Sequence, residues 1–225
     1  MKKIFFASFL ISLLALGNPA ASFAQSYFKG QVKYSISYPK KSKMDPAMQS
    51  ALPSVMTIKV KDNMKKTIVP MSVMTQVEIT NGDEQSRTVL IDIMGQKIAI
   101  KSSKEKIEKE MAENPAPEIE YLNETKKILG YNCKKAKVTY TEKNGSSNSF
   151  EIFYTEEIQF SPKLNFDSQL KEIDGLPLEF TMIENDIEMN FKAKEIIDGK
   201  VKNSDFKISD DYKFVTEEEL KTMFG

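Results

Sequence analysis

Residues 32–38 read Val-Lys-Tyr-Ser-Ile-Ser-Tyr, and this stretch decides the fold that the sequence predicts. Apolar and polar side chains alternate along it without interruption. Successive side chains of a β-strand point to opposite faces, so this period of two predicts a strand with one buried face and one face in water. Strands of an all-parallel sheet are usually apolar on both faces, and the alternation therefore favours an antiparallel sheet.

The same alternation returns along most of the chain. It predicts further strands at residues 56–60, 77–79, 89–93, 98–100, 136–140, 150–154, 176–182 and 187–193. Short turns rich in Gly, Asn and Asp separate many of them, and such turns are typical of hairpins. These turns lie at residues 81–83, 94–96, 143–146, 184–186 and 198–200. We therefore expect about ten antiparallel strands.

Helical patterns are few. Residues 103–112 contain good helix formers, residues 216–219 form a capping box that opens a last helix, and residues 46–52 are a weaker candidate. A large sheet with one apolar face must close, fold onto itself or curl around other apolar parts. The predicted fold class is mainly β (α+β), a strongly curved antiparallel half-barrel of about ten strands with a few short covering helices. The alternative is a face that packs against itself as a sandwich or is plugged by the helices.

The first 24 residues predict export. Two lysines precede an apolar run from Ile4 to Leu16, and Ser22-Phe23-Ala24 has the small residues that a signal peptidase reads. The run is too short to span a membrane, for which about 20 residues are needed. We expect cleavage after Ala24 and a single periplasmic or secreted domain over residues 25–225. Residue 25 is Gln and not Cys, which argues against a lipid anchor.

Composition narrows the function classes. The chain has 32 Lys and Arg, 32 Asp and Glu and no histidine. Balanced charge gives no support for nucleic acid as a partner. Without histidine, the usual serine, cysteine and zinc sites cannot be assembled in the usual way, and no pair of carboxylates stands out for glycoside hydrolysis. We predict no catalytic residues, no cofactor, no metal and no enzyme.

The stretch 124–136 (ETKKILGYNCKKA) resembles the central hairpin of a group of secreted Gram-negative envelope proteins of unknown function, related to the GLPGLI proteins. Residues 28–34, 90–92 and 211–213 are similar to the same pattern. The resemblance extends to the lipoprotein-carrier (LolA-like) fold, a curved antiparallel half-barrel closed by helices over an apolar cavity for acyl chains. It implies that fold and suggests a lipid ligand, and it transfers no catalytic position.

Together these observations predict a soluble periplasmic protein that binds or carries a lipid or other hydrophobic ligand in the cavity of its sheet. The predicted ligand-binding residues are Tyr34, Ile36, Met56, Ile58, Val77, Ile79, Val138, Tyr140, Ile152, Phe180 and Phe191. The alternative is an envelope protein-interaction module, a stress sensor or assembly factor, that offers the sheet or its edges to a partner chain.

Two further features have competing interpretations. Six of the twelve methionines fall between Met44 and Met74, which is compatible with copper ligation, with an adaptable apolar surface, or with plain packing. Gly130, Tyr131 and Cys133 form a structural motif in which Gly130 supplies a backbone conformation that other residues rarely reach. Cys133 is the only cysteine, and strand parity with Lys135 places it on the wet face, although free cysteines are usually buried.

Overall fold

The computed structural model describes residues 26–39, 44–114, 116–141, 147–184 and 187–224. The predicted signal peptide and its cleavage site lie outside these residues, so export stays a prediction. The turns predicted at 143–146 and 184–186 fall wholly or partly outside them as well. No helix in the described ranges is long and apolar enough to cross a membrane.

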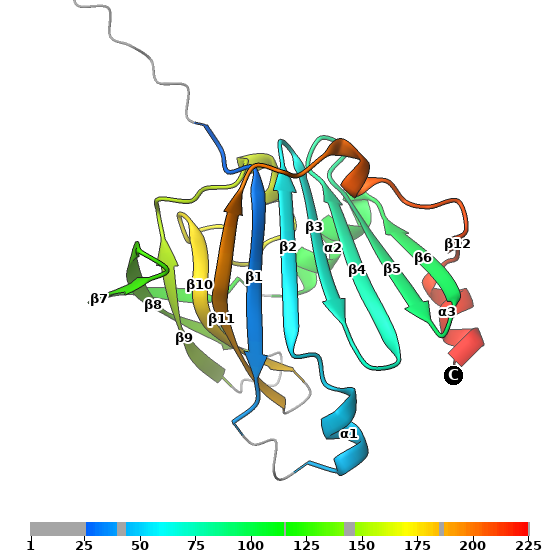
Figure 1. Ribbon diagram of the computed structural model, residues 1–225, viewed down its shortest axis with the longest axis horizontal. Coiled ribbons are helices and arrows are strands. Elements are labelled where there is room, and N and C mark those ends of the chain that lie inside the picture. Colours follow the sequence, from blue (N-terminus) through cyan, green and yellow to red (C-terminus); the bar gives the residue numbers. More distant parts are fainter. Residues whose placement is uncertain (1–25, 40–43, 115, 142–146, 185–186, 225) are drawn as a thin grey trace, which may run out of the picture.

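The fold is mainly β, with one large sheet and few helices, which confirms the predicted class (Figure 1). The strands are β1 (Gly30–Ser37), β2 (Val55–Lys61), β3 (Met64–Pro70), β4 (Met74–Asn81), β5 (Ser86–Ile93), β6 (Gln96–Ser102), β7 (Glu118–Ile128), β8 (Tyr131–Thr141), β9 (Ser147–Thr155), β10 (Leu176–Glu184), β11 (Ile187–Asp198) and β12 (Lys213–Phe214). The helices are α1 (Pro46–Ala51), α2 (Lys104–Glu113) and α3 (Glu217–Phe224), with short 3₁₀ turns η2 (Pro162–Leu164) and η3 (Asn203–Phe206).

The twelve strands form a single sheet in the order β12-β6-β5-β4-β3-β2-β1-β11-β10-β9-β8-β7. Every neighbouring pair is antiparallel except β12 with β6. The end strands β12 and β7 do not pair with each other, so the sheet is open. Figure 1 shows the sheet bending beyond β1 and β11, so that β7, β8 and β9 turn away behind the other strands.

Residues 156–175, which we call the strap, connect β9 to β10 by crossing one face of the sheet. That face carries Tyr34, Ile152 and Phe180 by strand parity, and we call it the inner face. At one end of the strap, Leu170 and Ile173 pack on Val138 and Ile152.

The middle of the strap is tied to the other half of the sheet by polar contacts. Ser161 Oγ donates to Asn63 Oδ1 at 2.6 Å, and Lys163 Nζ donates to Asp83 Oδ1 at 2.7 Å. Asp167 Oδ2 lies 3.5 Å from Thr80 Oγ1. The strap therefore bridges the two halves of the curved sheet across its inner face.

In the half of the sheet that contains β4 to β6, apolar side chains are buried on both faces, since Ile98 is buried on the inner face there as well. Beside the β1–β11 pair, the inner face is the core. On β4 to β6, an apolar cluster that contains Val77, Ile79 and Leu90 lies on the opposite, outer face and packs against Ile208 and Tyr212 from the segment after η3. Because β4 pairs Val77 with Ile68, and β3 pairs Ile68 with Thr57, Val77 and Ile58 lie on opposite faces. The prediction of one continuous apolar face is therefore wrong for Val77 and Ile79.

The chain after β11 is held by a partly exposed ion pair to β2 and by a hydrogen bond from β3. Lys59 Nζ donates to Asp205 Oδ1 at 2.6 Å, and Lys66 Nζ donates to the Asp205 backbone oxygen at 2.8 Å. The two lysines are direct neighbours across β2 and β3. Burial and the nearby Lys59 charge lower the pKa of Lys66, while the hydrogen bond from Lys59 lowers the pKa of Asp205. The contact holds the last segment on the outer face.

The predicted helices form close to the predicted bounds. The Thr216 backbone N–H donates to Glu219 Oε2 at 2.7 Å, and the Glu219 N–H donates to Thr216 Oγ1 at 3.1 Å, so the capping box is present at α3. Helix α2, predicted over 103–112, begins at Lys104, one residue later than predicted, and buries Ile107. Helix α1 follows Asp45, whose side chain accepts the Ala47 N–H at 2.8 Å.

Candidate functional site

The eleven residues predicted to bind a hydrophobic ligand do not line one cavity. Tyr34, Ile36, Met56, Ile58, Phe180 and Phe191 belong to one core cluster or pack against it. Val138, Tyr140 and Ile152 belong to a second cluster or pack against it, and Val77 and Ile79 belong to the cluster on the outer face. Most of these side chains are buried core. Tyr140 and Phe180 differ from the rest, since they also line a pocket.

That pocket, which we call the aromatic pocket, has a volume of about 350 Å³. Its lining residues come from β8, β9, β10 and the strap: Tyr140, Asn148, Phe150, Gln169, Leu170, Phe180, Met182 and Ile183. Three aromatic rings and two carboxamides therefore meet at one place on the inner face. Met182, 42 % exposed, and Ile183, 46 % exposed, are among its most exposed apolar side chains.

The aromatic rings of the pocket are held in fixed positions. Tyr140 and Phe150 stack with ring centroids 5.7 Å apart and an interplanar angle of 22°. Phe180 stacks on Phe191 at 4.7 Å and 4°, and meets Tyr34 edge to face at 5.8 Å. The Tyr34 hydroxyl donates to the Pro177 backbone oxygen at 2.8 Å, which fixes that ring in turn. Burial raises the pKa of Tyr140, so its hydroxyl stays protonated at neutral pH.

The two carboxamides reach the pocket from different elements. Asn148 lies directly opposite Tyr140 across β8 and β9, so antiparallel pairing brings its side chain beside the ring. Gln169 comes from the strap, next to Leu170, which packs on the second core cluster. A carboxamide offers both a donor and an acceptor. The pocket can therefore bind a ligand that has an apolar face and a rim of hydroxyl or amide groups.

A second pocket, which we call the edge pocket, lies on the same strands near the β7 edge and has a volume of about 500 Å³. It is lined by Tyr121, Leu122, Asn123, Thr125, Lys134, Lys135, Tyr154, Glu156 and Asp174. Tyr121 is 56 % exposed, and its hydroxyl donates to the Glu172 backbone oxygen of the strap at 2.7 Å. Its ring meets Tyr154 edge to face at 6.4 Å. An exposed ring is thus held in place by its own hydroxyl.

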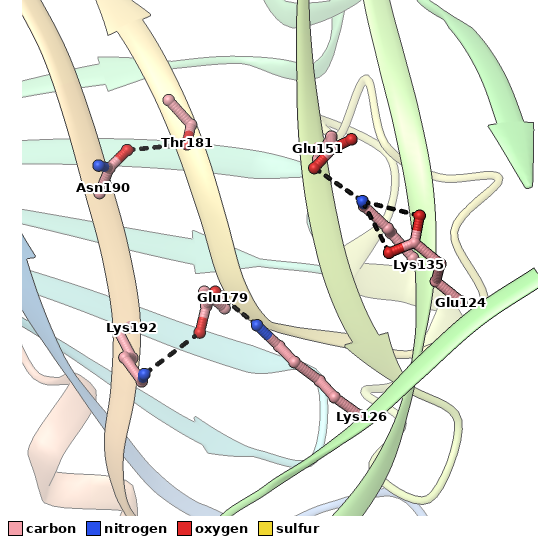
Figure 2. Close-up of polar contacts among 8 residues, drawn as sticks. All are labelled: Glu124, Lys126, Lys135, Glu151, Glu179, Thr181, Asn190 and Lys192. Carbon is pink, nitrogen blue, oxygen red and sulfur yellow. Dashed lines mark hydrogen bonds and ion pairs between the residues drawn. The ribbon is translucent and has the colours of Figure 1, made fainter. Parts of the chain in front are cut away.

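The outer face of the same strands carries a ladder of charged pairs (Figure 2). Lys126 Nζ donates to Glu179 Oε1 at 2.5 Å and lies 3.7 Å from the centroid of the Phe153 ring. The other oxygen of Glu179 lies 3.5 Å from Lys192 Nζ. Lys135, only 8 % exposed, bonds to both Glu124 and Glu151, and these hydrogen bonds raise the pKa of Lys135. Lys126, Lys135 and Lys192 each have a carboxylate partner, and the Lys126–Glu179 pair links β7 to β10 across Phe153 of β9.

Replacing Glu179 with Gln should make stability less dependent on pH. Burial alone would raise the pKa of the Glu179 carboxyl, but the hydrogen bond and charge of Lys126 outweigh it, and the pKa lies below its ordinary value. A depressed folded-state pKa stabilises the fold above the unfolded-state pKa of about 4.3, and this contribution is lost as the pH falls through the folded value. We expect Glu179→Gln to cost about 1 kcal/mol at pH 7, a modest figure because the pair is partly exposed.

Urea unfolding at pH 7 and at pH 3 measures this difference. The gap between the native protein and Glu179→Gln should narrow at the lower pH. Glu120→Gln, which removes an exposed carboxylate on strand β7, is the control and should change stability little. An equal loss at both pH values would show that the contribution of Glu179 is not electrostatic.

The Gly130 motif is a hairpin turn. Ile128 pairs with Tyr131, and the two residues between them, Leu129 and Gly130, have φ values of 51° and 90°. A two-residue turn with both φ values positive is the type I′ turn that joins twisted strands. Cys133 lies on the outer face by parity with Lys135, yet it is 0 % exposed because apolar side chains including Ile128 cover it. Burial raises the pKa of the Cys133 thiol, so it is not an activated nucleophile.

Neither a third cleft nor the clustered methionines makes a stronger candidate binding site than these two pockets. A cleft of about 1020 Å³ lies between α2, β6 and the chain from Phe214 to Glu219, and its lining mixes lysines with glutamates. Among the described residues, no group of three or more His, Cys, Asp or Glu side chains could hold a metal ion. Of the clustered methionines, Met64 packs against the outer-face cluster, and Met56 packs against the first core cluster.

Comparison with known families decides the relationship. Residues 54–211 match the family model described as N-glycanase peptide, N-terminal domain, and this segment is more than half of the 225 residues. The chain belongs to this family. Both pockets on the inner face lie within the matched segment, whereas the cleft beside α3 extends beyond it. No curated protein matches the chain.

Membership of the N-glycanase N-terminal domain family corrects four predictions. The resemblance to the GLPGLI proteins and to the LolA-like carriers is wrong, because the motif that carried it is a local I′ turn that many hairpins can use. The lipid-carrier function and the alternative of an envelope interaction module are wrong as well. The prediction that the protein is not an enzyme is also overturned, since the family to which the chain belongs is named for an N-glycanase.

Six of the residues that line the aromatic pocket were missed as site residues: Asn148, Phe150, Gln169, Leu170, Met182 and Ile183. Phe150 lies in a predicted strand with the parity of Ile152, and this parity was the signal that could have placed it on the ligand-binding face. Gln169 has no such signal, because the strap lacks any hydrophobic period.

Proposed function

We propose that this chain serves an N-glycanase reaction by holding the carbohydrate of an N-linked glycopeptide in the aromatic pocket. An N-glycanase, by its name, acts on N-linked glycans, and the family carries that name. The observation that supports the proposal most is the meeting of stacked aromatic rings with two carboxamides inside the matched segment.

The chemistry of the pocket suits a sugar. A pyranose ring has an apolar face of C–H groups, which packs on an aromatic ring such as Phe150, and a rim of hydroxyls. The carboxamides of Asn148 and Gln169 can donate to these hydroxyls and accept from them. Among the described residues that line the pocket there is no lysine or arginine, so none of them offers a cation to a phosphate or a nucleic acid.

The size of the pocket limits how much of a glycan it holds. Its volume of about 350 Å³ is near the lower end of the range for small-molecule sites, which runs from about 300 to 1,000 Å³. We therefore propose that it takes a small part of a glycan, one or two sugar rings, and that the remaining rings lie outside it.

Binding of a defined glycopeptide tests the proposal. A peptide that carries one N-linked glycan, and the same peptide without it, are titrated into the native protein by calorimetry. We expect binding of the glycopeptide and none of the bare peptide. Phe150→Ala should weaken binding about fivefold or more, since removal of one stacking ring costs about 1 kcal/mol or more. Gln169→Ala should weaken it less.

Phe153→Ala is the matched control. Phe153 lies on the same strand as Phe150 but on the outer face, beneath Lys126. It should keep the native affinity even if it costs stability, and thermal unfolding monitors the fold of both variants. Equal losses in the two variants, or equal binding of the peptide with and without its glycan, would refute the proposed function.

A further inference from the structure

The aromatic pocket and the edge pocket lie on the same face of the same two strands. On β8, Lys134 and Tyr140 are both even-numbered and share the inner face, and on β9 the same holds for Phe150 and Tyr154. Ile173 of the strap packs between them, on Ala136 and its neighbours. The two pockets are therefore separated by the strap and not by the sheet.

The spacing of the two pockets follows from strand geometry. Lys134 and Tyr140 are six residues apart on β8, which corresponds to about 20 Å at about 3.4 Å per residue. Phe150 and Tyr154 are four residues apart on β9, about 14 Å by the same measure. One or two sugar rings cannot reach both pockets, whereas an extended or branched oligosaccharide can.

The edge pocket repeats the chemistry of the aromatic pocket with more polar groups. Tyr121 presents an exposed ring whose hydroxyl is tied to the strap, so little rotational freedom is lost when a ligand stacks on it. The Asp174 and Glu156 carboxylates can accept hydrogen bonds from hydroxyls. Lys134 bonds to both oxygens of Glu156 at 2.7 Å, which fixes the direction in which that carboxylate points.

We propose that the edge pocket is a second carbohydrate subsite, and that the ligand of this domain is an oligosaccharide of several sugars that lies across the strap. This inference rests on the proposed function, because it assigns a second part of the same glycan to a second place on the inner face. It predicts that affinity increases with glycan size and that the additional affinity depends on the Tyr121 ring.

The test compares two glycans on three proteins. The probes are the disaccharide N,N′-diacetylchitobiose and a released biantennary N-glycan, each titrated into the native protein, Tyr121→Ala and Tyr121→Phe. We expect the native protein to bind the larger glycan at least tenfold more tightly than the disaccharide. Tyr121→Ala should remove this gain without changing disaccharide binding. Tyr121→Phe retains the ring and loses only the hydrogen bond to the strap, and it should keep most of the gain.

A measurement on the native protein avoids reliance on the variants. In NMR spectra, the larger glycan should shift the ring signals of Tyr121 and Tyr154 as well as those of Tyr140 and Phe150, and the disaccharide should shift only the latter pair. Equal affinity for both probes, with the Tyr121 signals unmoved, would overturn the second subsite and leave the proposed function intact. Loss of disaccharide binding in Tyr121→Ala would also overturn it, because Tyr121 would then act on the aromatic pocket through the strap. If neither probe binds the native protein, the proposed function itself fails.

Discussion

Gly175→Ala should destabilise the protein by about 3–5 kcal/mol, the sum of backbone strain and a steric overlap. Gly175 is the last residue of the strap and has a φ of +137°, a conformation that L side chains rarely adopt. A Cβ added there would overlap the backbone oxygen of Thr155, the last residue of β9. Leu176 pairs with Thr155, so the overlap can be relieved only by moving the start of β10 away from β9.

Gly95→Ala is the control that separates the cost of backbone strain from the cost of steric overlap. Gly95 lies in the turn between β5 and β6 with a φ of +88°, and a Cβ added there would have nothing within 4 Å. This variant should lose only the conformational term of about 1–2 kcal/mol. Urea unfolding of the two variants gives both free energies. Similar losses would mean that the close approach of the strap to β9 is not a constraint on the fold.

The strands with a clear alternation could be predicted from the sequence, and those without it could not. Residues 32–38 and 187–193 alternate and form most of β1 and β11. Strand β3 was missed because all of its residues except Pro70 are half-buried, and its Lys65-Lys66-Thr67 reads as polar. Strand β7 was missed because it is the edge of the sheet, where most side chains face water. When the side chains on both faces of a strand are partly exposed, apolar and polar residues no longer alternate, and the strand cannot be predicted from that alternation.

The candidate site depends on register and on the strap, and neither can be read from local patterns. Phe180 meets the inner-face strands because it pairs with both Ile152 and Phe191. Gln169 lies in the aromatic pocket only because the strap crosses the sheet there. The predicted function failed for a related reason. It was inferred from an apolar face that was assumed to be open. In the structure, the strap and the packing of the inner-face side chains against one another bury most of that face.

Leu178→Ala should cost about 3–5 kcal/mol, the usual range for a leucine removed from a packed core. Leu178 is 0 % exposed and belongs to the first core cluster together with Tyr34 and Phe191. It also lies at the point where the pairing of β10 with β9 shifts, between Pro177 and Glu179. At a bulge, packing and not strand-to-strand hydrogen bonding fixes the position of the side chain. Loss of the Leu178 side chain therefore leaves a cavity and removes packing that stabilises the register shift.

Two controls assign the cause of the loss. Leu178→Met keeps the volume and should cost less than about 1.5 kcal/mol, while Leu129→Ala, at a position 46 % exposed, should be close to neutral. The bulge lies two residues before Phe180, so the aromatic pocket provides a second readout. If packing at Leu178 holds the bulge, Leu178→Ala weakens glycan binding as well as stability, and Leu178→Met restores both. Retained binding in a destabilised Leu178→Ala variant would instead mean that the stack of Phe180 on Phe191 is sufficient to fix the register of β10.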